Sequence, residues 1–67
     1  MMEIQLNGEP LEVPANATIA DLLEQLSVRG RRLAVEVNED IVPRSTHSEF
    51  TLSPGDRVEV VHAIGGG

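Results

Sequence analysis

Apolar and polar side chains alternate in three stretches of the chain, which is the pattern of strands with one buried face. These stretches cover residues 2–6, 33–37 and 57–64. Each has apolar side chains at alternate positions along one side, so that side of each strand can face a common core. We therefore expect a sheet that contains all three stretches.

A hairpin is predicted at the start of the chain, because Asn7-Gly8 follows the first strand. This dipeptide is typical of a two-residue type I′ turn, in which both positions need a positive φ. Pro10 has no N–H to donate, so the second strand is expected at an edge of the sheet. The turn fixes the register, which pairs Leu6 with Glu9, Ile4 with Leu11 and Met2 with Val13.

One short helix is predicted after the hairpin. Thr18 is a suitable N-cap, and Asp21 stands where a capping box needs an acidic side chain. Gly30 and the arginines around it are expected to end the helix. One side of the helix is apolar at the spacing i, i+3, i+4 and i+7, through Ile19, Leu22, Leu23 and Leu26.

The remaining segments predict short elements. Asn38-Glu39-Asp40 is expected to turn the chain before the apolar residues 41–43, and Phe50 with Leu52 suggests a brief strand. Ser53-Pro54-Gly55-Asp56 is a turn sequence. The sum is an α+β domain with one mixed sheet of four to five strands and one main helix packed on one face.

Composition excludes most side-chain chemistry. The chain has 67 residues, no cysteine and no lysine, and a net charge of −6. Such a length offers little volume for a core and an enclosed pocket together, so we expect the protein not to be an enzyme. Disulfides, thiolate sites and Schiff-base chemistry are excluded. The acidic balance argues against nucleic acid, and no apolar run is long enough for a membrane span.

The absence of disulfides in so small a domain suggests a reducing compartment, and we expect a cytoplasmic protein without a leader segment. We expect neither a bound metal nor a bound cofactor. His47 and His62 do not have the spacing of a metal site and are interpreted as two partly exposed histidines. Ser45, Thr46 and Glu49 lie close to His47 in the sequence, but so short a chain has little room for a substrate cleft.

The last predicted strand carries apolar residues on both sides. Val61 and Ala63 point away from the side that holds Val58 and Val60. Since one helix covers only one face of a sheet, we expect Val61 and Ala63 on an open face that docks a partner. Glutamates on the polar sides of the strands serve solubility or steer the protein to a basic surface; they are Glu3, Glu9, Glu12, Glu36 and Glu59.

The chain ends in three glycines, residues 65–67, which we call the C-terminal arm. Glycines without side chains add little to a fold, but they can enter a narrow channel in another protein. We expect a domain over residues 1–64 followed by this flexible arm. The α-carboxylate of Gly67 would be ionised at neutral pH and would need activation, for instance as an acyl adenylate.

This arrangement resembles a ubiquitin-type β-grasp protein, and in detail the ThiS family of thiamin-pathway sulfur carriers. Gln5-Leu6-Asn7-Gly8-Glu9 and Leu22-Leu23 fit that family. The strongest resemblance lies in the second half, which reads Val42-Pro43-Arg44-Ser45, then His47, then Gly55-Asp56-Arg57-Val58-Glu59-Val60-Val61-His62-Ala63-Ile64-Gly65-Gly66-Gly67.

The resemblance implies that an E1-like adenylyltransferase (ThiF-like) adenylates Gly67 with ATP. Sulfur from a cysteine desulfurase-derived persulfide donor then gives a thiocarboxylate, which supplies thiazole synthase (ThiG-like). Gly65 and Gly66 would thread into the partner, and Glu59, Val61, Ala63 and Ile64 would contact it. Two alternatives remain, a small-subunit-like carrier of molybdopterin synthase and a non-catalytic β-grasp interaction module.

Overall fold

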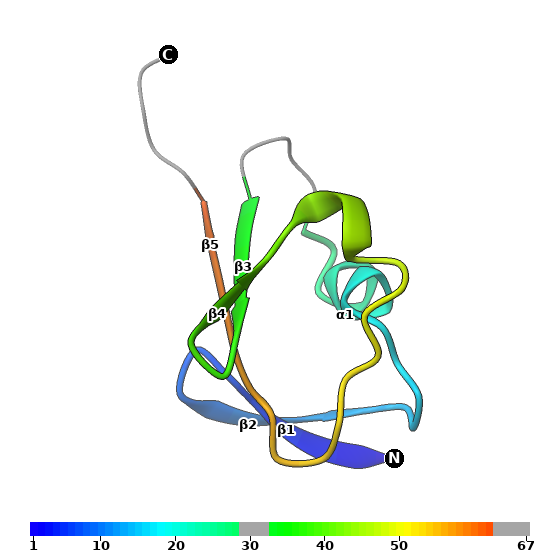
Figure 1. Ribbon diagram of the computed structural model, residues 1–67. Helices are drawn as coiled ribbons and strands as arrows, with labels where there is room; N and C mark the ends of the chain where they lie inside the picture. Colours follow the sequence, from blue (N-terminus) through cyan, green and yellow to red (C-terminus); the bar gives the residue numbers. More distant parts are fainter. Residues whose placement is uncertain (29–32, 63–67) are drawn as a thin grey trace.

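The computed structural model describes residues 1–28 and 33–62 and contains one mixed sheet with a helix packed against it (Figure 1). The sheet has five strands in the order β2-β1-β5-β3-β4, so the last strand of the chain lies in the middle. β1 and β5 are parallel, and the other neighbours are antiparallel. The elements are β1 (Met2–Leu6), β2 (Glu9–Val13), α1 (Ile19–Gln25), β3 (Leu33–Val37), β4 (Asp40–Val42), the 3₁₀ helix η1 (Arg44–Thr46) and β5 (Arg57–His62).

The core lies between α1 and the inner face of the sheet. Every strand contributes at least one buried side chain to this core, and these are Ile4, Val13, Val35, Val37, Val42 and Val58. Leu23, Leu26 and Phe50 are partly buried and pack around this core. The apolar stripe predicted for the helix is therefore confirmed. The largest fully buried side chains are those of Ile4, Val13, Ile19, Leu22, Val35 and Val58.

The predicted hairpin register is confirmed at every pair, from Met2 opposite Val13 to Leu6 opposite Glu9. Asn7 has a φ of 50° and Gly8 a φ of 87°, as a type I′ turn requires. β2, which carries Pro10, is an edge strand, as its missing N–H predicts.

The helix begins as expected but ends earlier than predicted. The Thr18 hydroxyl accepts a hydrogen bond from the Asp21 N–H (3.1 Å), and the Asp21 carboxylate accepts one from the Thr18 N–H (3.0 Å). The last helical residue is Gln25, so the expectation that Gly30 and the arginines end the helix was wrong.

The early end is a Schellman motif built on a serine. Ser27 has a φ of 56°, its N–H donates to the Glu24 carbonyl, and the Val28 N–H donates to the Leu23 carbonyl (both 3.0 Å). Serine in the left-handed region gives no strong sequence signal, because glycine is the usual residue there.

A strand at Phe50 and Leu52 was also expected, and the structure has only an isolated bridge between Thr51 and Thr18. The Leu52 N–H donates to the Ala17 carbonyl (2.8 Å), and the Ile19 N–H donates to the Phe50 carbonyl (3.1 Å). Phe50 and Leu52 therefore hydrogen-bond to the start of α1 and the residues before it instead of extending the sheet. Leu52 is buried all the same.

Replacing Ser27 by glycine should stabilise the protein. A left-handed φ costs a residue with a Cβ atom more than it costs glycine, so we expect a gain of about 0.5–1 kcal/mol in the free energy of unfolding in urea. Ser27→Ala keeps the Cβ atom and should bring no gain. Equal stability of the glycine and alanine variants would contradict the role given to this φ.

Candidate functional site: the open face of the sheet

The candidate site is the outer face of the sheet, on the side away from α1. On β5 the side chains of Arg57, Glu59 and Val61 are exposed, whereas Val58 is buried and Val60 is half-buried. The alternation predicted for this strand is therefore confirmed within the described residues. Val61 is 52% exposed, which is unusual for a large apolar side chain on a central strand.

Neighbouring strands extend this apolar area. Ala34 on β3 lies directly opposite Val61, and Ile41 on β4 lies opposite Glu36 on the same face. Ile41 is 72% exposed. Sequence reasoning missed it, because only the β3–β4 register shows which side of the sheet residue 41 takes. We call Ala34, Ile41, Glu59 and Val61 the docking face.

The same outer face carries two pairs of glutamates in direct opposition. Glu36 pairs with Glu59 across β3 and β5, and Glu3 pairs with Glu12 across β1 and β2. Like charges that face each other across antiparallel strands destabilise a sheet. The fold therefore retains these charges at some cost in stability, which favours the interpretation that they meet a basic surface.

A shallow hollow next to the docking face is also acidic. Gln5, Gly8, Glu36, Glu39, Arg57, Val58 and Glu59 line it. The lining thus contains three carboxylates and one guanidinium, so a cation or a basic side chain is better suited to this hollow than an anion.

Ala63 and Ile64, which were expected to contact a partner, lie outside the described residues, as does the arm over residues 65–67. The expected boundary between the domain and the arm lies there as well. The described structure leads to them through His62, the last residue of β5.

The two histidines lie in different parts of the molecule. His62 is exposed at the end of β5, but His47 is buried, so the expectation that both are partly exposed was wrong for His47. Its Nε2 lies 3.1 Å from the Val42 carbonyl oxygen and must donate, since a carbonyl only accepts. Within residues 1–28 and 33–62 no three histidine or acidic side chains could hold a metal ion.

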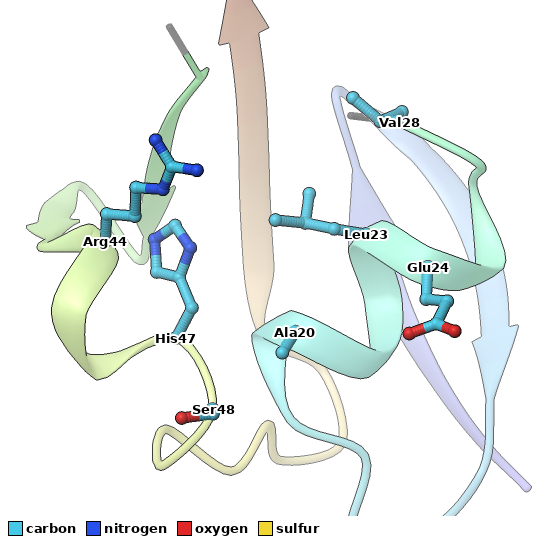
Figure 2. Close-up of a pocket in the computed structure, with 7 residues that line it drawn as sticks. All are labelled: Ala20, Leu23, Glu24, Val28, Arg44, His47 and Ser48. Carbon is cyan, nitrogen blue, oxygen red and sulfur yellow. The ribbon is translucent and has the colours of Figure 1, made fainter. Parts of the chain in front are cut away.

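A second hollow lies between α1 and η1, where Arg44 and the His47 ring face Ala20 and Leu23 (Figure 2). The hydroxyl of Thr46 donates to the Pro43 carbonyl (2.9 Å) and closes the 3₁₀ turn. With Nε2 of His47 also engaged, these side chains serve packing and turn formation.

The five-stranded mixed sheet with one helix defines a ubiquitin-like β-grasp domain. The sequence matches the ThiS family over residues 4–67, and the chain belongs to that family. No helix in the described part of the chain is long and apolar enough to cross a membrane.

Three similar proteins illustrate the relationship. The chain is 33% identical to the sulfur carrier protein ThiS of Escherichia coli over 66 residues, covering 98% of this chain and 100% of that protein. The crystal structure of ThiS from Geobacter metallireducens superposes with a TM-score of 0.87 at 30% identity and covers 98% and 100% of the two chains. A thiazole synthase of Paramagnetospirillum magneticum is 41% identical over 66 residues, but these are 98% of this chain and only 20% of that protein.

Neutralising one glutamate of an opposed pair should stabilise the domain. We expect Glu59→Gln to raise the free energy of unfolding by about 0.2–1 kcal/mol, because it removes the repulsion from Glu36. The measurement is urea unfolding at low and high salt, and salt should reduce the gain.

Glu9→Gln is the matched control, since Glu9 is an exposed strand residue that lies opposite Leu6. It changes the net charge by the same amount without relieving an opposed pair. A gain of the same size in Glu9→Gln would mean that net charge alone is responsible.

Proposed function

We propose that this chain carries sulfur at the carboxyl group of Gly67. The family match is the observation that carries the proposal, because it extends through residue 67 and so includes the glycines. The reaction begins when an E1-like enzyme joins the Gly67 carboxylate to the α-phosphate of ATP and releases pyrophosphate. The terminal sulfur of a persulfide (R–S–S⁻) then attacks the carbonyl carbon and displaces AMP, which gives an acyl disulfide. A second thiol, supplied by a partner protein or a small-molecule reductant, attacks the donor sulfur and breaks the S–S bond, which releases the Gly67 thiocarboxylate and leaves a disulfide on the donor.

Thiazole synthase is the proposed acceptor of this sulfur. The support is that two thiazole synthases each contain a region similar to nearly all of this chain. That region makes up 20% of the length of each enzyme. Placing a carrier and its acceptor in one polypeptide raises their effective concentration. The thiamin branch is favoured over the molybdopterin branch because thiazole synthases and ThiS carriers are among the proteins similar to this chain.

The docking face is proposed to hold the carrier on its partners. Two of its residues, Glu59 and Val61, lie on β5, and Val61 is only four residues before the first glycine of the arm in the sequence. Apolar Val61 and Ile41 would supply buried area, and the acidic residues around them would favour a partner with arginines or lysines.

The central experiment is an intact-mass measurement of the protein isolated from cells that make thiamine. We expect a fraction in which one C-terminal oxygen is replaced by sulfur. An unmodified terminus under active thiamine synthesis would instead favour the non-catalytic interaction module. Supplying the thiocarboxylate to purified thiazole synthase and to molybdopterin synthase then separates the two branches.

Activation should require a free carboxyl group on Gly67. We expect a variant with one alanine added after Gly67 to show no ATP–pyrophosphate exchange with the activating enzyme, because its Gly67 carbonyl is part of a peptide bond. A variant with one alanine added before Met1 is the control and should exchange normally. Equal exchange by both variants would exclude Gly67 as the activated residue.

Val61→Asp should weaken partner binding while leaving the fold intact. We expect at least about a fivefold loss of affinity for the activating enzyme, with little change in unfolding temperature, because Val61 is exposed. Val58→Asp is the comparison, since Val58 is buried on the other side of β5 and an aspartate there should unfold the domain. An unchanged affinity of Val61→Asp would remove this residue from the interface.

A further inference from the structure

β5 loses its backbone partner on the β1 side before it reaches its end. The last paired residue of β1 is Leu6, opposite Val58, and the Asn7 N–H still donates to the Val58 carbonyl (2.8 Å). With φ values of 50° and 87°, Asn7 and Gly8 then turn the chain away into β2. A parallel strand that continued straight would have supplied the next two hydrogen bonds, to Val60.

The side chain of Asn7 supplies these two hydrogen bonds instead. Its Oδ1 accepts from the Val60 N–H (2.9 Å), and its Nδ2 donates to the Val60 carbonyl (3.3 Å). A carboxamide has the same acceptor and donor as a peptide group, so it satisfies both backbone groups of Val60. The backbone pairing of β1 with β5 ends at Val58, and the Asn7 side chain extends the hydrogen bonding by two residues, to Val60.

A second asparagine makes a related contact at the opposite end of β5. Asn38 has a φ of 52°, and its N–H donates to the Arg57 carbonyl (2.7 Å). Its side-chain Oδ1 accepts from the Arg57 N–H (3.0 Å), and its Nδ2 donates to the Asp56 carboxylate (3.1 Å). Two asparagine side chains therefore bind β5 near its two ends. Asn38 binds at the start of the strand, and Asn7 binds near its end, from which the chain continues to the arm.

Beyond Val60, the pairing of β5 in the described structure is with β3 alone. Val61 lies opposite Ala34 and His62 lies opposite Leu33. The hydrogen bonds between the Asn7 side-chain amide and Val60 are thus the last ones described on the β1 side of β5. Without it, the end of β5 would be held on one side only and would open more readily.

We propose that Asn7 is a positioning residue for the C-terminal arm, acting through the backbone of Val60. This inference rests on the proposed function, because it concerns the delivery of Gly67 to the activating enzyme. Gly67 is seven residues beyond Val60 in the sequence, so the point from which the chain continues towards the carboxylate depends on how firmly the end of β5 is held. A carrier that docks normally but presents Gly67 less often should react more slowly once bound.

The test compares Asn7→Gly with Asn38→Gly. Both variants keep a residue that tolerates a positive φ, and each removes one carboxamide that makes two hydrogen bonds to the region of β5. We expect Asn7→Gly to lower kcat for ATP-dependent activation about tenfold with a smaller change in KM, because the docking face is retained. Asn38→Gly should change kcat less than about twofold at the same temperature.

Hydrogen exchange of the Val60 amide is the second measurement, and it does not depend on the activating enzyme. It should accelerate in Asn7→Gly and stay near the wild-type rate in Asn38→Gly. If Asn7→Gly does not fold, Asn7→Asp replaces it. Asp keeps the acceptor for the Val60 N–H and loses the donor, so its kcat should fall less than tenfold but measurably.

Two results would overturn the inference. The first is an unchanged kcat in the Asn7 variant despite faster exchange at Val60, and the second is an equal fall in the Asn7 and Asn38 variants, which would reflect the stability of the fold. Failure of the wild-type chain to be activated would count against the proposed function and would be seen before any variant is compared.

Discussion

The pairing of β5 with β1 on one side and β3 on the other is the interaction on which the rest of the fold depends. β5 is the last described strand in the sequence and the middle strand of the sheet. It joins the pair β2-β1 to the pair β3-β4, so the five-stranded sheet cannot form without it. Val58 on this strand is fully buried and lies between Leu6 of β1 and Val37 of β3. The free energy of folding is therefore coupled directly to the segment that leads into the glycines. Such long-range pairing also implies slower folding than local contacts would give.

A central strand at the carboxyl end has a consequence for function. β3 on one side and Asn7 on the other hold β5 close to its last residue, His62. A strand at the edge of the sheet would be held on one side only. The topology thus gives the chain a well-held position at His62, which would suit the chemistry proposed for Gly67.

Local physical rules predicted the parts of this fold that depend on neighbouring residues. Asn7-Gly8 gave the hairpin register, Thr18 with Asp21 gave the start of the helix, and the alternation around Val61 gave the open face. The family resemblance predicted the β-grasp fold as a whole. These signals are strong because each needs only a few residues close together in sequence.

The features that were missed depend on contacts between distant segments or on unusual local choices. Leu52 pairs with Ala17 rather than with a strand, and His47 is buried because its ring reaches the Val42 carbonyl. Ser27 ends the helix although glycine is the usual residue there. The second half of the site, around Ile41, could be located only once the β3–β4 register was known.

The outer face of the sheet combines two features that a domain selected for stability alone would avoid, exposed large apolar side chains and glutamates in direct opposition. A chain of 67 residues has a small core and little stability to spare, so each such feature matters more than it would in a larger protein. Both features are relieved when a partner covers the face, because apolar area is then buried and basic side chains can lie between the carboxylates. The exposed apolar side chains and opposed glutamates that lower the stability of the free domain would therefore stabilise its complex. Binding on the side of the sheet without a helix would thus gain the most free energy.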